Sequence, residues 1–340
     1  MRRISLILAA FLATGAAPPP PAPLQPYIQD GRFDPGDYAW MRGRFEDASA
    51  ADKAAYAAVR AWTDSCFQAG QAENRAELRA LGIAEPKLER VDFRDALCAS
   101  VATIPYGIEF KSFAEFEKAL QSARPVADTF LLAVKMAEQT GGPRGPTLAD
   151  RLLARPLSEQ MLRKGLGWGE GELSHAPPLD PPVKAIVRAR IGIALAEADR
   201  ANTAWLKGIV EKQGWPKISE VGEHASFQAW LLVQHADADP AFQLRALRLM
   251  EPLVARGEVS KRNYAYLYDR VMLKIAGKQR YATQAMCSGG KRVPQPLEDA
   301  AAVERLRTEA GLEPLKQYMA ELDAMAGNCP ADRPGPTASK

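Results

Sequence analysis

Most of this chain carries apolar residues at helical spacing, and glycine, proline and capping residues divide that spacing into segments. The spacing predicts helices at about 52–81, 112–123, 125–140, 184–213, 220–238, 240–256, 261–276, 300–310 and 314–326. Another helical start is expected near Thr147, and Pro156 should split that segment. Residues 101–110 contain β-forming side chains broken by proline and glycine, which indicates a short hairpin or an irregular loop. The predicted fold class is mainly α.

Two stretches rich in proline or glycine divide the chain into regions. Residues 165–183, GLGWGEGELSHAPPLDPPV, carry four glycines before a single histidine and four prolines after it, which is typical of a domain boundary. The run APPPPAPLQP predicts an extended proline-rich spacer over residues 17–40. We therefore expect a helical N-terminal domain at 41–165, an α-helical bundle domain at 184–327 and a flexible tail at 328–340.

The first residues have the features of a secretory signal peptide. A positive start at Arg2 and Arg3 is followed by the apolar run ISLILAAFLA and then by small residues. We expect cleavage after Ala16, so that residues 1–16 are removed. The apolar run is shorter than the roughly 20 residues that a transmembrane helix needs, and no later stretch is apolar for that length. The mature protein is therefore expected to be periplasmic or secreted, with no membrane span.

The charge of the mature chain is close to neutral. The full sequence has 44 Lys and Arg against 41 Asp and Glu, and two of the basic residues belong to the expected signal peptide. No block of five or more Lys or Arg residues occurs. Proteins that bind nucleic acid usually carry a basic patch, so we do not expect nucleic acid as a partner.

The chain has four cysteines, Cys66, Cys98, Cys287 and Cys329. An even number in an exported protein favours disulfides, and four cysteines allow three pairings. We expect Cys66–Cys98 and Cys287–Cys329, because each pair then lies within one expected domain. A zinc site is the alternative interpretation, but no CxxC occurs and the spacings between the cysteines are long.

Several ordered pieces between residues 199 and 284 resemble a known family. The pieces are DRANTAWLKGIVEKQGWP, SEVGEHASFQAWLLVQHADADPAFQ, GEVS, AYLYDRV and QRYATQ. Together they resemble the bacterial domain-of-unknown-function family 6624, whose pattern contains GWP, a helix that ends in QHAD, a DR pair and a closing Q-x-Y-x-TQ. The resemblance covers about residues 199–320, and Ala282 stands where the family pattern has glycine. It implies a domain, but no reaction, cofactor or partner.

The segment VGEHASFQAWLLVQHAD has apolar residues around nearly the whole helical circumference, which predicts a buried helix. One polar seam interrupts them, where His224, Gln228 and His235 fall within about 40° of one another. The seam is either a ligand-binding stripe or a set of polar groups that face water or bond within the protein. The two histidines would lie about 16 Å apart along the helix, too far to share a metal ion. We expect no metal site and no cofactor.

His235 has several polar neighbours where this helix should end, among them Gln234, Asp237 and Asp239. A histidine beside a carboxylate can act as a general base, with the carboxylate fixing the imidazole tautomer. Alternatively, His235 caps the helix C-terminus, where the helix dipole favours a cation. No GxSxG, HExxH or catalytic-cysteine pattern occurs, so no nucleophile is predicted.

A second polar group follows about 35 residues later. Asp269 and Arg270 lie off the apolar stripe of their helix, which suggests an ion pair or, for Arg270, bidentate binding of an anion. The next irregular segment is rich in hydrogen-bonding groups, which either line a ligand site or tie down the loop. The candidate ligand-binding residues are therefore His224, Gln228, Gln234, His235, Asp237, Asp269, Arg270, Gln279, Tyr281, Thr283 and Gln284.

The sequence thus indicates an exported cell-envelope protein of an uncharacterised family. The leading hypothesis is a ligand- or partner-binding module, whose partner is a small molecule or an envelope protein. One alternative is an envelope hydrolase that uses His235 as base with Asp237 or Asp269 in support, and another is a purely structural protein. The sequence leaves open whether the protein is an enzyme.

Overall fold

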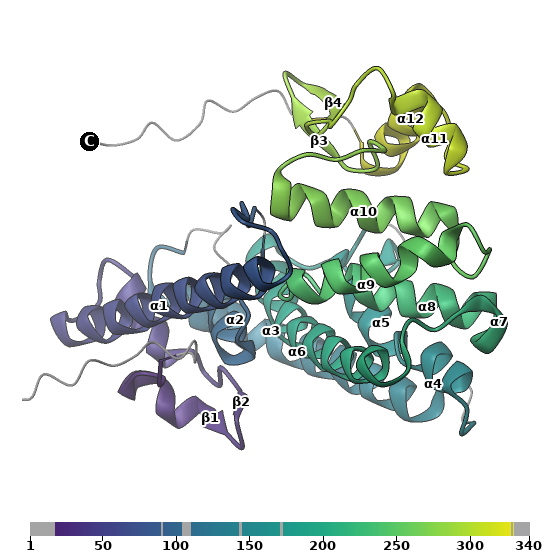
Figure 1. Ribbon diagram of the computed structural model, residues 1–340. Coiled ribbons are helices and arrows are strands. Elements are labelled where there is room, and N and C mark those ends of the chain that lie inside the picture. Colours follow the sequence, from purple (N-terminus) through teal and green to yellow (C-terminus); the bar gives the residue numbers. More distant parts are fainter. Residues whose placement is uncertain are drawn as a thin grey trace, which may run out of the picture.

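The computed structural model describes residues 18–89, 91–103, 110–142, 145–170, 173–327 and 329. Within these residues helices dominate, and each sheet is only a two-stranded pair, so the predicted mainly α fold is confirmed (Figure 1). The predicted signal peptide, most of the expected loop at 101–110 and the tail at 328–340 apart from Cys329 lie outside the described residues. The α-helices are α1 (Ala50–Ala80), α2 (Ala96–Ala102), α3 (Phe113–Thr140), α4 (Leu148–Ala154), α5 (Leu157–Leu166), α6 (Pro181–Gln213), α7 (Ile218–Val221), α8 (Glu223–Gln234), α9 (Pro240–Val254), α10 (Lys261–Ala276), α11 (Val303–Glu309) and α12 (Leu315–Ala326).

Several helix ends follow the capping residues of the sequence. The Thr147 hydroxyl accepts a hydrogen bond from the Asp150 N–H at 3.1 Å, and the Asp150 carboxylate accepts one from the Thr147 N–H, which forms a capping box for α4. The segment then divides at Pro156, as expected, because proline cannot supply the N–H that would continue the helix. Local capping chemistry therefore fixes where α4 and α5 meet.

Two expected helix boundaries are wrong. Pro125 lies inside the continuous helix α3 instead of starting a new one, because Leu120 and Ala127 on either side of it are buried on the same face. Packing of that face offsets the roughly 3 kcal/mol that an internal proline costs. The helix expected at 220–238 is instead divided at Gly222, whose positive φ of 82° separates α7 from α8.

The proline-rich segment at 17–40 is not an extended spacer over its described length. It forms a 3₁₀ helix at Ala22–Tyr27, a short antiparallel pair of β1 (Ile28–Gln29) and β2 (Arg32–Phe33), and the start of a second 3₁₀ helix. Several of its large apolar residues are buried, among them Leu24, Phe33 and Trp40. Their burial against the helices removes apolar surface from water, which an extended chain would leave exposed.

Two hydrophobic cores meet along the long helix α6 (Figure 1). The N-terminal core combines residues of α1, α2, α3 and α5 with Ile186 and Ile191 from the first half of α6. The C-terminal core combines α8, α9 and α10 with Leu206 from the second half of α6, and it also takes Leu78 and Leu152 from earlier helices. The expected division into domains stays a prediction, and α6 is shared by both cores.

A small region at the C-terminus was not predicted in full. Strands β3 (Ala285–Ser288) and β4 (Lys291–Pro294) pair antiparallel through a Gly289-Gly290 turn with both φ values positive. Together with α11 and α12, this hairpin lies above α10 in Figure 1. The helical spacing of the surrounding sequence gave no signal for it, because each strand has only four residues.

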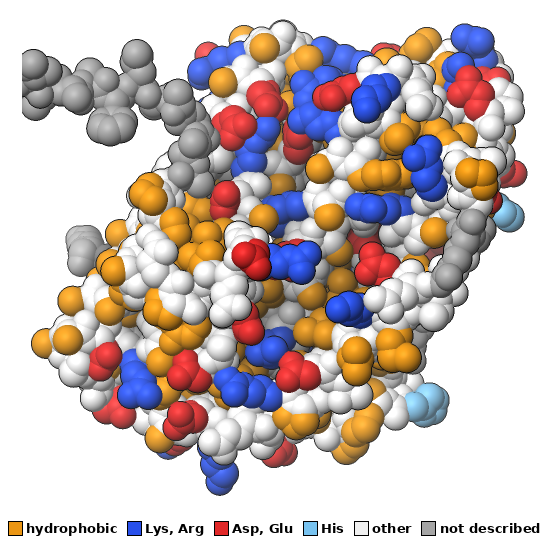
Figure 2. All heavy atoms as spheres, turned by 90° about the horizontal axis from the view of Figure 1, so that it is seen from below, with side chains coloured by type: hydrophobic (Ala, Val, Ile, Leu, Met, Phe, Trp, Pro, Cys, Tyr) orange, Lys and Arg blue, Asp and Glu red, His pale blue; other side chains and the backbone are white. Residues whose placement is uncertain are grey.

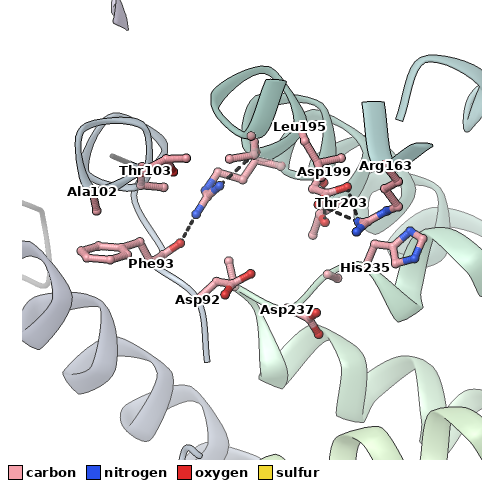
Figure 3. Close-up of a pocket in the computed structure, with 16 residues that line it drawn as sticks. Asp92, Phe93, Ala102, Thr103, Arg163, Leu195, Asp199, Thr203, His235 and Asp237 are labelled. Carbon is pink, nitrogen blue, oxygen red and sulfur yellow. Dashed lines mark hydrogen bonds and ion pairs between the residues drawn. The ribbon is translucent and has the colours of Figure 1, made fainter. Parts of the chain in front are cut away.

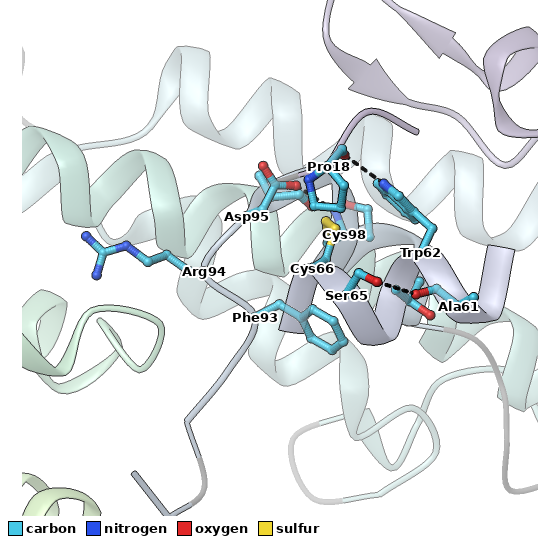
Figure 4. Close-up of a disulfide and its surroundings, with 12 residues drawn as sticks. Pro18, Ala61, Trp62, Ser65, Cys66, Phe93, Arg94, Asp95 and Cys98 are labelled. Atoms are coloured by element: carbon cyan, nitrogen blue, oxygen red, sulfur yellow. Dashed lines mark hydrogen bonds between the residues drawn. A yellow bond between two sulfur atoms is a disulfide. The ribbon is translucent and has the colours of Figure 1, made fainter. Parts of the chain in front are cut away.

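Both expected disulfides are confirmed. Cys66–Cys98 joins α1 to α2 across a sequence separation of 32 residues (Figure 4), and Cys287–Cys329 joins β3 to the end of the described chain. Near the first bridge, the Trp62 indole N–H donates a hydrogen bond to the Pro18 carbonyl at 2.8 Å. The bridge and this bond attach the N-terminal segment and α2 to the same part of α1.

Two general surface properties concern the whole described chain. None of its described helices combines the length and the apolar character needed to cross a bilayer. On the face shown in Figure 2, Lys and Arg side chains are interspersed with Asp and Glu side chains. This mixed distribution agrees with the nearly balanced counts of basic and acidic residues in the sequence.

Replacing both Cys66 and Cys98 with Ala should lower the free energy of unfolding by about 3–4 kcal/mol. The bridge closes a loop across a separation of 32 residues, and opening it gives the unfolded chain more conformational freedom. Urea unfolding of the variant and of the wild type, each with and without a reductant, measures the effect. The reductant should then lower the free energy of unfolding of the variant by less than it lowers that of the wild type. Equal stability of the oxidised wild type and the variant would contradict this.

Candidate functional site

Of the three residues in the predicted polar seam, His235 lines the pocket described below, whereas His224 and Gln228 do not line it. His224 is exposed at the start of the helix and Gln228 is half-buried. The helix is also less buried than expected, because 41% of Phe227 is exposed and its ring packs on Trp230 at 5.1 Å. Helix α8 ends at Gln234, and His235 occupies the C-cap position with its N–H bonded to the Leu231 carbonyl.

The pocket has a volume of about 320 Å³ and lies beside α6 (Figure 3). Its walls come from residues 92–93, α2, α5, α6 and the residues that follow α8. Figure 3 shows His235, Arg163 and Asp199 at one end, Phe93 and Ala102 at the other, and Asp92 between them. The residues that line it are Asp92, Phe93, Ala99, Ala102, Thr103, Arg163, Gly192, Leu195, Ala196, Asp199, Arg200, Thr203, His235, Ala236, Asp237 and Ala238.

A fully buried carboxylate, Glu159 of α5, holds His235 in place. Its Oε1 is hydrogen-bonded to His235 Nδ1, and its Oε2 accepts a bond from Asn202 Nδ2 of α6 at 2.7 Å. Burial acts to raise the pKa of Glu159, but the hydrogen bond and charge of His235, with Asn202 and Arg163, bring it below its usual value. Glu159 is therefore ionised at neutral pH and accepts the Nδ1 proton of His235.

This contact determines which ring nitrogen of His235 is free. A carboxylate that accepts from Nδ1 favours the tautomer in which Nε2 carries the lone pair. Among the described residues, Nε2 has no hydrogen-bond partner. When the ring is neutral, His235 therefore offers the pocket an acceptor that can bind a ligand donor or take a proton.

Arg163 joins this pair to a second carboxylate. Its Nη2 lies 2.8 Å from both oxygens of Asp199, and its Nε lies 3.4 Å from Glu159 Oε1. Burial, together with the nearby charge of Glu159, raises the pKa of Asp199 to about 7 despite Arg163. One ligand atom from each of Glu159, Asp199 and His235 lies within 4.8 Å of the others, which is a spacing that could surround a cation. However, the Arg163 guanidinium already forms ion pairs with both carboxylates, so a metal ion would have to displace it.

Asp237 forms an ion pair with Arg270, which was a candidate for binding an anionic ligand. Arg270 donates from Nε and Nη2 to both Asp237 oxygens, and Lys274 Nζ donates to the same carboxylate and to Gln243 Oε1. Burial acts to raise the pKa of Asp237, but the charges of Lys274 and Arg270 hold it well below its usual range. The ion-pair interpretation of Arg270 therefore describes the structure, and the partner is Asp237.

Asp269 ties down a loop. It is fully buried, and its carboxylate accepts hydrogen bonds from the N–H groups of Arg280, Tyr281 and Thr283 at 2.7–2.9 Å. Ala282 within this loop has a positive φ of 54°, a conformation that glycine adopts more readily than alanine. The loop residues therefore bond mainly to one another.

The remaining predicted residues have similar internal roles. Gln279 is fully buried, donates to the carbonyls of Gln284 and Gln295, and accepts from the Gln284 N–H. With its amide oriented to satisfy both neighbours, the Gln234 oxygen accepts from Trp230 Nε1 and the Leu267 N–H. Gln284 alone among the loop residues lines a second pocket, of about 210 Å³, beside Arg270 and Lys274.

Most of the polar residues around the pocket were not predicted from the sequence. Glu159, Arg163 and Asp92 lie before the family-like pieces, and nothing in their spacing connects them to His235. A signal did exist for Asp199, Arg200 and Asn202, because all three belong to the piece DRANTAWLK. That piece and QHAD meet at the pocket, which spacing along one helix could not show.

Residues 176–328 match a family model described as a family of unknown function, DUF6624. This part of the chain is therefore similar to that family. The resemblance inferred from the sequence is thereby confirmed. No curated protein and no solved structure matches the chain. The matched range contributes four charged or ionisable pocket residues, Asp199, Arg200, His235 and Asp237. The pocket residues Asp92, Phe93 and Arg163, and helix α2, lie outside that range.

Asp237→Asn should lower the free energy of unfolding at pH 7 by about 3 kcal/mol, because it leaves Arg270 and Lys274 without their anionic partner. The pKa of Asp237 is lower in the folded protein than in the unfolded chain. Its stabilisation is therefore present above about pH 4 and is lost on further acidification. The difference between wild type and variant should narrow as the pH falls from about 5 to about 2.

Urea unfolding of Asp237→Asn between neutral and acidic pH measures this difference. Asp128→Asn is the matched control, since Asp128 forms an ion pair with Arg190 at 2.9 Å while its side chain is 59% exposed. An exposed pair of this kind should contribute less than about 1 kcal/mol. Equal losses in the two variants at pH 7 would refute the role given to Asp237.

Proposed function

We propose that this protein binds a small ligand in the pocket beside His235. The observation that carries the proposal is an imidazole held by a fully buried carboxylate, with its second nitrogen unpartnered at a pocket of about 320 Å³. A buried charge is costly to maintain. The pairing of the buried Glu159 carboxylate with His235 therefore supports a functional role for the ring. Ligand pockets commonly have volumes of about 300–1,000 Å³ with a few convergent polar groups.

The place of action proposed is the cell envelope, as a periplasmic or secreted protein. The start of the sequence supports export, and the two disulfides fit an oxidising compartment. A small molecule suits the pocket better than a protein partner, because the polar groups point into a concave site. A purely structural role for His235 is the outcome that the first test below distinguishes.

A second candidate function is hydrolysis, and the Glu159–His235 contact favours it. Glu159 replaces the supporting carboxylates expected from the sequence, because Asp237 is bound to Arg270 and Lys274 and Asp269 to loop amides. His235 Nε2 would take a proton from water as the oxygen attacks an ester carbonyl carbon. The ester C–O bond then breaks, and the proton returns from His235 to the leaving alkoxide.

His235→Asn should remove ligand binding without unfolding the protein. The polar Asn keeps a donor for Glu159 but places no acceptor where Nε2 stands. Native mass spectrometry of protein prepared without denaturation detects a retained ligand, and isothermal titration with that ligand gives its Kd. His224→Asn is the control, since His224 is exposed and outside the pocket. Undiminished binding by a folded His235→Asn variant would leave the structural role.

If the pocket is hydrolytic, Glu159→Gln should lower kcat by about 100-fold with a smaller change in KM. The variant keeps the size of the side chain but loses the charge that stabilises protonated His235. Hydrolysis of p-nitrophenyl acetate measures the effect, and circular dichroism checks that the variant is folded. Glu170→Gln is the control, because Glu170 is an exposed carboxylate paired with Lys184. Hydrolysis that is absent, or equal in both variants, would exclude this candidate.

A further inference from the structure

We infer that the ligand of the His235 pocket carries both an ammonium group and a carboxylate, as a free amino acid does. This inference rests on the proposed binding function and adds the chemical class of the ligand. Two charged side chains in the pocket wall carry it. Asp92 would bind the ammonium group and Arg200 the carboxylate.

Asp92 has a fixed backbone and a carboxylate that lacks a partner. Its N–H bonds to the Asp237 carbonyl, which places the residue on the pocket wall. No hydrogen bond or ion pair to the Asp92 carboxylate occurs within the described part of the chain. Asp92 is exposed to solvent, yet burial of its carboxylate by the surrounding protein and the charge of Asp237 raise its pKa. A ligand cation would supply the missing opposite charge.

The nearest basic side chains do not fill that role. Arg270 and Lys274 both bind Asp237, and Arg163 binds Asp199. Arg200 acts on Asp92 through charge alone, without a hydrogen bond between them. An ammonium group is the cation that suits this place best, because its three N–H donors can bond to one carboxylate and still reach neighbouring acceptors.

Arg200 has donors left for an anion. Three of its N–H groups bond to the carbonyls of Phe93, Arg94 and Ala196. A guanidinium carries five N–H donors, so two remain, and the side chain lines the pocket. Burial lowers its pKa, yet an arginine stays charged in proteins. A ligand carboxylate would accept charge-assisted hydrogen bonds from the two remaining donors.

The rest of the pocket limits the size and polarity of the ligand. Phe93 and Ala102 form an apolar end, and Phe93 is held by edge-to-face packing on Phe67 at 5.3 Å. The opposite end carries His235. The volume of about 320 Å³ is at the lower end of the range for ligand pockets. An amino acid with an apolar side chain matches this combination of opposite charges, small volume and one apolar end.

The test begins with isothermal titration of the intact, oxidised protein with the standard amino acids. L-leucine is then compared with 3-methylbutylamine, which lacks the carboxylate, and with 4-methylpentanoic acid, which lacks the ammonium group. Each comparison removes one charge and keeps the apolar body. Loss of either charge-assisted contact should weaken binding about tenfold or more.

Asp92→Asn tests the protein side of the ammonium contact. It should weaken binding of L-leucine about tenfold or more and leave binding of 4-methylpentanoic acid unchanged. Asp64→Asn is the control, because Asp64 is exposed on α1 and lines neither of the two pockets described above. Arg200 is not substituted, because its bonds to three carbonyls also fix the pocket wall. Its contact is tested by the titration with 3-methylbutylamine, which lacks the carboxylate.

The outcomes separate this inference from the proposed function. If an analogue with one charge binds as tightly as L-leucine, or if Asp92→Asn binds L-leucine normally, the zwitterion inference is overturned. If no amino acid binds while another ligand depends on His235, the inference is overturned and the binding function stands. If no retained or added ligand depends on His235, both fall.

Discussion

The structure around the pocket depends on one buried charge. Glu159 has no exposed surface, and it stays ionised because His235 and Asn202 bond to its two oxygens. Moving either partner away would leave a carboxylate uncompensated in the interior, which is strongly unfavourable. The contact therefore fixes α5, α6 and the end of α8 relative to one another. His235 and the pocket wall are positioned by that requirement.

The pocket lies where the two hydrophobic cores meet. Helix α6 contributes to both cores, and its residues 192–203 form one wall. The opposite wall is held by backbone bonds in which Lys87, Glu89 and Asp92 donate to carbonyls of Ile275, Lys274 and Asp237. Asp237 then anchors the same region through Arg270 and Lys274. Most charged groups around the pocket are thus paired within the protein. The Asp92 carboxylate, two N–H groups of Arg200 and His235 Nε2 are then the groups available to a ligand.

Local sequence signals predicted much of the fold. The capping residues around Thr147, the split at Pro156 and both cysteine pairs were expected, because each depends on chemistry within a short segment or on export. The internal Pro125 and the buried segment at 22–45 were not, because tertiary packing overrides the local preference there. A four-residue strand also gives too short a pattern to recognise.

The same difference between local signals and tertiary contacts explains which residues of the site were predicted. His235 and Asp237 were chosen because they are close in the sequence, and both do line the pocket. Glu159 lies 76 residues from His235, and a single acidic residue on an amphipathic helix carries no sign of its partner. Asp269 and Gln279 have polar side chains in an irregular segment, but these satisfy the backbone of their own loop. Residue type and spacing indicated polarity here, whereas only the three-dimensional structure shows which polar groups are already satisfied.

We infer that Glu159 holds the neutral His235 ring in one tautomer, with Nε2 free at the pocket. Long-range ¹H–¹⁵N spectra of the imidazole rings, recorded at a pH where the rings are neutral, test this inference most directly. The chain has three histidines, and the exposed His175 and His224 serve as internal references that average between tautomers. We expect His235 to show a protonated Nδ1 and an unprotonated Nε2. A His235 spectrum averaged like the other two, or one with the proton on Nε2, would contradict it.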